Sequence, residues 1–128
     1  MEFVNFEIAK RLKDLGYNEP FFFFYRTDDQ LLHHAMVGKS LVYGKYVDDE
    51  VVISPTIEQV LNWLRKEKYI FIGISPMQEY GGEETVEWCS TVYKSSKQGG
   101  LSLKEEFYYQ SYEQAALAGI EYVIDNLI

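Results

Sequence analysis

The sequence predicts an α+β fold, with three helices packed on one mostly antiparallel sheet of about five strands. Three stretches repeat apolar residues at helical spacing, and the stretches between them are rich in β-branched and aromatic residues, as strands are. Short spacers separate neighbouring strand candidates, which favours antiparallel hairpins over parallel crossovers. The predicted order is helix, hairpin, helix, three-stranded meander and helix. At 128 residues the chain has the usual length of one domain, so we expect a single domain over 1–128.

Two of the predicted helices carry a clear N-cap. The helix over 6–15 follows Asn5, whose side chain can accept a hydrogen bond from the first free amides. It ends before Gly16, which tolerates the left-handed conformation of a helix stop. The C-terminal helix follows Ser111, and Gln114 three residues later completes a capping box. Both stretches repeat apolar residues every three or four positions, so each helix should bury one face.

The central helix is predicted from its start signal and from its charges. It begins near Ser54-Pro55-Thr56, where either Ser54 or Thr56 can act as the N-cap. Apolar residues then recur on one face as far as Leu64. The basic residues that follow, within 65–68, favour the negative C-terminal pole of a helix.

Four consecutive phenylalanines, at 21–24, mark the first strand. A strand sends neighbouring side chains to opposite faces, so two rings must lie on each side of the sheet. We expect protein to cover both sides. The strand over 21–26 and a second one over 31–37 flank a turn-rich spacer, which predicts a hairpin. A further short strand is expected over 41–47.

The meander is predicted over 69–74, 85–93 and 101–109. Its first strand alternates three isoleucines on one face with Tyr69, Phe71 and Gly73 on the other. This pattern is typical of a central strand that is covered on both sides.

The net charge indicates which classes of partner are not expected to bind the chain, and the cysteine content indicates the cellular compartment. The net charge is -8, from 12 basic and 20 acidic residues, so phosphate backbones should repel the chain and no nucleic-acid partner is expected. The acidity serves solubility, or marks an acidic inhibitor that imitates DNA. Cys89 is the only cysteine, which excludes an intramolecular disulfide and fits a cytoplasmic protein. No signal peptide or stretch of about 18–20 apolar residues is present, so no membrane association is expected.

The sequence carries none of the common catalytic fingerprints, and we expect neither a metal nor a cofactor. His33 and His34 are neighbours on a predicted strand, so their rings point to opposite faces and cannot chelate one metal together. Cys89 lies in mid-strand, where cysteine is usually a small buried hydrophobe. A small enzyme that uses His33 or the loop carboxylates of 48–50 and 79–84 stays open as an alternative.

The aromatic residues are the feature that points most directly to a function. The chain holds 11 Tyr, 8 Phe and 2 Trp, and tyrosine suits interfaces because its ring packs while its hydroxyl stays hydrated. The candidate interaction surface, on or next to the meander, comprises Tyr80, Trp88, Tyr93, Tyr108 and Tyr109. A stacking platform for nucleic acid would need Lys and Arg, whereas the same region carries several Glu. We therefore expect a non-catalytic module that binds a partner protein or self-associates.

Three segments, over 7–20, 54–65 and 111–122, carry a family resemblance. With them the chain resembles a group of short uncharacterised proteins encoded by gut Bacteroidetes and their phages or prophages. The matching segments are helix starts and apolar stripes, so the resemblance implies a fold and no particular reaction. It also implies a cytoplasmic protein that originates from a phage or another mobile element.

Overall fold

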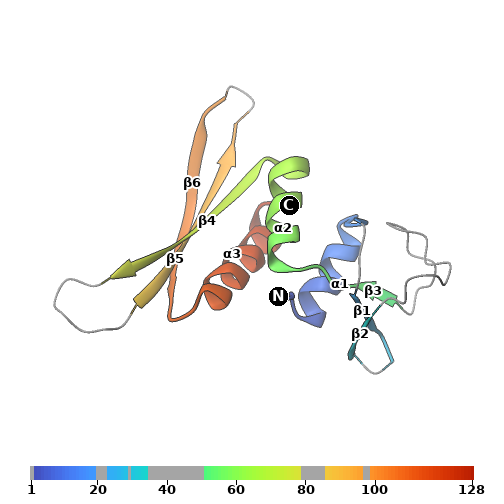
Figure 1. The fold of residues 1–128 in the computed structure, drawn as a ribbon. Helices are drawn as coiled ribbons and strands as arrows, with labels where there is room; N and C mark the ends of the chain where they lie inside the picture. Colours follow the sequence, from blue (N-terminus) through green and yellow to red (C-terminus); the bar gives the residue numbers. More distant parts are fainter. Residues whose placement is uncertain (1, 20–22, 29, 35–50, 79–85, 97–98) are drawn as a thin grey trace. The chain divides into compact units, whose positions relative to one another are not determined.

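The computed structural model describes residues 2–19, 23–28, 30–34, 51–78, 86–96 and 99–128 (Figure 1). The chain divides into two compact units, Met1–Thr56 and Ile57–Ile128. Helices and antiparallel strands occur in both, which confirms the α+β class. The expectation of a single domain over 1–128 stays a prediction.

The strands form two three-stranded sheets, one in each unit, where the sequence predicted one sheet of about five strands. Every described strand pairs within its own unit. Alternation of side chains along a strand shows that the strand exists, but it does not name the strand's neighbours. The additional strand, β3 (Val51–Ile53), is only three residues long and directly precedes a helix start, so its pattern is too short to detect.

In the first unit, helix α1 (Phe6–Asp14) begins and ends as predicted. The Asn5 side chain accepts a hydrogen bond from the Ile8 amide at 2.9 Å, so Asn5 is the N-cap. Gly16 has a φ of 92°, and the Tyr17 amide donates back to the Leu12 carbonyl at 2.9 Å. These features form a Schellman motif, which requires the left-handed conformation that glycine adopts without strain.

The sheet of the first unit has β1 (Phe23–Arg26) at its centre, between β2 (Leu32–His34) and β3. The antiparallel pairing of β1 with β2 confirms the predicted hairpin. Phe23 and Phe24 are both half-buried, and the Phe23 ring meets the Phe3 ring edge-on at 4.9 Å. Phe21, Phe22 and the strand expected over 41–47 lie outside the described residues.

Apolar side chains of α1, β3 and the segments beside α1 form the core of this unit. Its fully buried members are Val4, Ile8, Ala9, Leu12, Tyr17, Val52 and Ile53. The hydroxyl of Tyr25 donates a hydrogen bond to the Val4 carbonyl at 2.8 Å and so ties β1 to the segment before α1.

The second unit begins with a short helix, α2 (Ile57–Trp63), which the chain continues as a π-helical turn, η1 (Leu64–Lys68). The turn ends at Tyr69, which adopts a left-handed conformation with a φ of 56°. The sequence predicted one regular helix here, because a change from α to π hydrogen bonding leaves no clear mark on apolar spacing. No helix formed by the described residues is long and apolar enough to span a membrane.

The rest of the second unit is the predicted meander followed by the predicted C-terminal helix (Figure 1). Strands β4 (Ile70–Gln78), β5 (Val86–Ser95) and β6 (Leu101–Tyr109) pair antiparallel in that order. Helix α3 (Tyr112–Asn126) packs along one face of this sheet. The Ser111 side chain accepts a hydrogen bond from the Gln114 amide at 3.1 Å, which confirms the predicted N-cap.

The interpretation of residues 69–74 as a central strand was wrong. β4 is an outer strand of its sheet, and α3 lies against only one of its faces. Ile72 is on that face, whereas Tyr69 is 64% exposed and Gly73 is also exposed. Apolar residues on both faces suggested two-sided cover, but part of that apolar surface is left open.

Candidate functional site

Among the described residues of the second unit, α3 packs on one face of the β4–β6 sheet and no helix packs on the opposite face. We call it the open face. Strand register assigns its members, because directly opposed residues share a face. Tyr93 lies opposite both Phe71 and Leu103, and Cys89 lies opposite Tyr108. The open face carries Phe71, Met77, Glu87, Cys89, Thr91, Tyr93, Leu101, Leu103, Glu106 and Tyr108.

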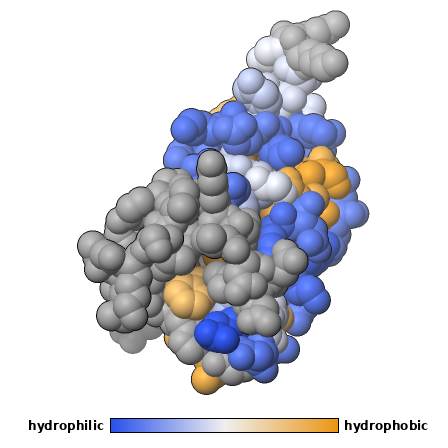
Figure 2. Space-filling model, turned by 90° about the vertical axis from the view of Figure 1, so that its right-hand side faces the viewer, coloured by the Kyte–Doolittle hydropathy of each residue, from blue (hydrophilic) through white to orange (hydrophobic). Residues whose placement is uncertain are grey.

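Large side chains on the open face are accessible to solvent. Met77 is 45% exposed, Leu103 and Tyr108 are each 52% exposed, and Leu101 is 60% exposed. Scattered apolar residues on a surface are ordinary, but several on one sheet face point to a binding surface. In the view of Figure 2 the coloured residues are mostly hydrophilic, and the hydrophobic ones gather in a few places among them.

A β-bulge brings the two leucines onto the open face. The register of β5 and β6 shifts between Val92 and Tyr93, so that Glu105 lies opposite Val92 while Leu103 lies opposite Tyr93. Strict alternation from Tyr108 would have placed odd-numbered residues of β6 on the α3 side. The extra residue at the bulge reverses this parity, so Leu101 and Leu103 join Tyr108. Sequence reasoning missed both leucines because a bulge has no reliable sequence signal here.

The predicted interaction residues divide between the two faces of the sheet. Tyr93 and Tyr108 lie on the open face. Trp88 and Tyr109 are paired with each other on the α3 side, where the Trp88 ring meets the Tyr112 ring edge-on at 5.5 Å. Tyr80 lies outside the described residues. Trp88 therefore contributes to packing against α3, while Tyr109 is 40% exposed at the margin of that face.

The charges of the open face are acidic. Glu87 and Glu106 occupy strand positions on it, and the residues that the register assigns to this face include no Lys or Arg; the register leaves Lys104, at the bulge, unpaired. The Tyr108 hydroxyl donates a hydrogen bond to Glu106 Oε2 at 3.2 Å. This bond to the carboxylate is the main reason why the pKa of Tyr108 is raised above its ordinary value of 10.0.

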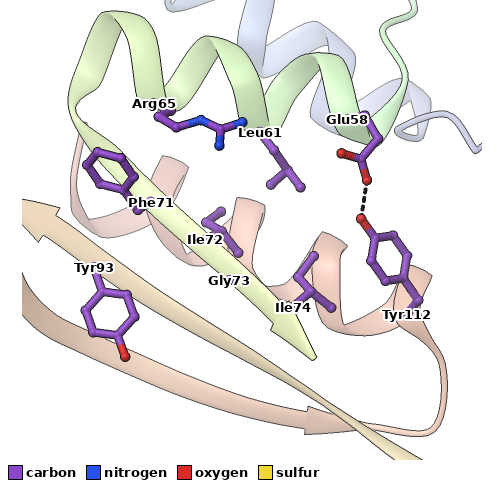
Figure 3. Close-up of a pocket in the computed structure, with 9 residues that line it drawn as sticks. All are labelled: Glu58, Leu61, Arg65, Phe71, Ile72, Gly73, Ile74, Tyr93 and Tyr112. Carbon is purple, nitrogen blue, oxygen red and sulfur yellow. Dashed lines mark hydrogen bonds between the residues drawn. The ribbon is translucent and has the colours of Figure 1, made fainter. Parts of the chain in front are cut away.

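A groove with a volume of about 380 Å³ lies between α2 and β4 (Figure 3). Its lining residues are Glu58, Leu61, Arg65, Phe71, Ile72, Gly73, Ile74, Tyr93 and Tyr112. At one end the Tyr112 hydroxyl donates a hydrogen bond to the Glu58 carboxylate. Towards the other end the exposed Arg65 side chain extends along the groove, and it forms no hydrogen bond or ion pair with the described residues.

Most groups that the enzymatic alternative would use lie outside the described part of the chain. These are the carboxylates of 48–50 and 79–84 and the side chain of His33. Among the described residues, no three side chains of His, Cys, Asp or Glu come close enough together to hold a metal ion. The Cys89 thiol is buried, and its Sγ lies 3.6 Å from the Thr91 hydroxyl.

No protein-family model, curated protein or solved structure matches the chain. The surface chemistry of the second unit is therefore the basis for a functional proposal.

Proposed function

We propose that the protein is a small non-catalytic interaction module that binds another protein through the open face. The observation that carries this proposal is the exposure of Met77, Leu101, Leu103 and Tyr108 on one face of one sheet. Removing each such side chain from water stabilises a complex by about 1 kcal/mol or more, since full burial is worth roughly 1.5–3 kcal/mol. A flat, mixed aromatic and aliphatic surface of this kind is typical of the centre of a protein interface.

The charges favour a partner of a particular chemistry. Glu87 and Glu106 flank the apolar residues, and the whole chain carries a net charge of -8. A second copy would bring the same carboxylates against these two, which is unfavourable. We therefore infer a different protein, with an apolar patch edged by Lys or Arg. The resemblance to proteins of gut Bacteroidetes and their phages supports a phage or mobile-element origin and a cytoplasmic bacterial partner.

Site-specific photo-crosslinking in bacterial cells tests the proposal. A photoreactive phenylalanine analogue replaces Leu103 in the full chain, and a second variant carries it at Ile128, which is 40% exposed and lies outside the open face. We expect a discrete adduct with one basic-edged protein from position 103 and none from position 128. With that protein purified, Leu103→Asp should weaken binding at least tenfold, because it places a charge in an apolar interface centre, whereas Ile128→Asp should leave affinity unchanged.

Two results would count against this function. One is equal crosslinking from both positions, and the other is an affinity that Leu103→Asp does not alter. A concentration-dependent dimer that Leu103→Asp dissociates would keep the open face as the interface but replace the different partner with a second copy.

A further inference from the structure

The outer edge of β4 offers backbone groups that its sheet does not use. The Ser95 amide donates to the Tyr69 carbonyl at 3.0 Å, which makes these opposed residues a hydrogen-bonded pair. Hydrogen-bonded and non-bonded pairs alternate along an antiparallel ladder, and the register of β4 with β5 has no shift. The amides and carbonyls of Ile72 and Ile74 therefore point away from β5, towards the free edge.

The groove lies on this free edge, because Ile72, Gly73 and Ile74 form one of its walls and residues of α2 form the other (Figure 3). No described strand pairs with β4 on that side. A volume of about 380 Å³ is within the range of pockets that accept a ligand, and Leu61 and Ile74 give it apolar walls. The groove can thus take side chains while β4 takes backbone hydrogen bonds.

Pro76 limits the length of the available edge. In the same alternation, position 76 is the next one whose backbone nitrogen faces outwards, and proline has no amide hydrogen to donate. Proline is accepted in an outer strand because its nitrogen faces away from the ladder. It also discourages unlimited edge-to-edge pairing. The usable edge is therefore a short one, centred on Ile72 and Ile74, which suits a peptide segment better than a whole sheet.

Arg65 adds a charge preference at one end. Its guanidinium has no partner among the described residues, and a planar guanidinium matches a carboxylate with two parallel hydrogen bonds. Figure 3 shows Arg65 near Phe71, towards the N-terminal end of β4. A strand running antiparallel to β4 brings its own C-terminal end to this position. Glu58, the acidic residue of the groove, is already bound by Tyr112.

We propose that the groove binds an extended segment of another protein, which pairs with Ile72 and Ile74 as a strand antiparallel to β4 and places a carboxylate on Arg65. Strand addition supplies affinity through the backbone, and the groove and Arg65 supply selectivity. The carboxylate is that of an acidic side chain or of a chain terminus. This site uses the edge of the sheet, and it adjoins the open face at Phe71 and Tyr93, which line the groove as well.

A displayed library of random ten-residue peptides, panned against the full chain, provides the probe. One library leaves the peptide C-terminus free and the other encloses the peptide within a carrier. The strongest binder is then synthesised. We expect Arg65→Gln to weaken it about 10- to 100-fold, since a charge-assisted pair is lost, and Lys66→Gln, the neighbouring exposed cation, to leave it unchanged. Binding should slow hydrogen exchange at the Ile72 and Ile74 amides.

Chemical variants of the same peptide separate the remaining possibilities. N-methylation at residues of one parity should abolish binding, while the other parity tolerates it, because alternate residues of a strand face β4. C-terminal amidation weakens binding if the carboxylate is terminal and has no effect if it belongs to a side chain. Leu103 does not line the groove, so Leu103→Asp should bind the peptide with the affinity of the wild type. A negative result for protein binding at the open face would therefore not count against the groove.

Four results would each overturn the proposal that the groove binds a strand of another protein. They are the absence of any binder from either library, unchanged exchange at Ile72 and Ile74 on binding, equal affinity of Arg65→Gln, and equal effects of N-methylation at both parities. Protection of the same amides by rising protein concentration alone would show that a second copy occupies the edge.

Discussion

Gly119→Ala tests how closely α3 packs on the sheet. Gly119 is buried in the middle of α3, and a Cβ atom at this position would lie 2.6 Å from Ser90 Oγ on β5 and 3.1 Å from Ile72 Cγ2 on β4. The first distance is well inside van der Waals contact. An alanine therefore requires the helix or the strands to move, and Ser90 is itself completely buried.

Two opposing terms set the size of the effect. Alanine is intrinsically a better helix residue than glycine by about 1 kcal/mol. Forcing an additional carbon into a packed core costs about 1–3 kcal/mol. Because two side chains on two strands must give way, we expect the steric term to exceed the helical gain, so that Gly119→Ala lowers the free energy of unfolding by about 1–2 kcal/mol.

Tryptophan fluorescence during urea unfolding measures this change in the second unit alone. Both tryptophans of the chain, Trp63 and Trp88, lie in that unit. With a denaturant dependence of about 1–3 kcal/mol per molar urea, a loss of about 1–2 kcal/mol should lower the midpoint by about 0.3–2 M.

Ser90→Ala is the matched partner in a double-mutant cycle. Its hydroxyl has no hydrogen-bond partner among the described residues, so its removal alone should change stability by less than about 1 kcal/mol. In the Ser90→Ala background, Gly119→Ala should cost clearly less, because the closest contact is gone. If Gly119→Ala instead stabilises the wild type by the full helical gain of about 1 kcal/mol, α3 does not approach β5 as closely as described.

Three further changes have definite expected outcomes. The hydrogen bond to Glu106 raises the pKa of Tyr108, so this bond stabilises the fold below pH 10 and is lost as the pH rises through the folded pKa. Glu106→Gln removes the carboxylate, and we expect Tyr108 to ionise at a lower pH in this variant than in the wild type. Phenolate absorbance during a pH titration of the two proteins measures the difference. Ser111→Ala removes the N-cap of α3 and should cost about 1 kcal/mol in the urea assay; an unchanged midpoint would contradict that cap. Tyr25→Phe removes the hydrogen bond to the Val4 carbonyl and should lower the stability of the first unit by about 1 kcal/mol. Amide hydrogen exchange across the first unit should then be faster than in the wild type, and equal exchange rates would contradict this role of Tyr25.

Features with short-range causes could be predicted from the sequence. Asn5, Gly16 and Ser111 each act on amides or carbonyls within five residues, so residue type and spacing were enough to place two helix starts and one helix stop. The hairpin and the meander followed from alternation interrupted by turn residues.

Features that depend on distant partners could not be predicted. The division into two sheets depends on which strands pair with each other. β4 lies at an edge because β5 is the one described strand that pairs with it. The candidate surface shows the same limit. Residue type selected Tyr93 and Tyr108, which lie on the open face, but it also selected Trp88, which packs against α3. It missed Leu101 and Leu103, because the bulge reverses the face to which they point.

The dimensions of the second unit explain why an open face exists at all. A helix of 15 residues is about 22 Å long, whereas β5, with 10 residues, extends about 33 Å. One helix about 10 Å wide can cover one face of a sheet whose strands lie about 4.8 Å apart, and only over part of its length. Within this unit α2 is too short to cover the second face. It lies beside the outer edge of β4, as the residues that line the groove show. A sequence that keeps Leu103 and Tyr108 on such a face retains apolar surface that folding of this unit does not bury, and contact with a partner protein is the use that we infer for it.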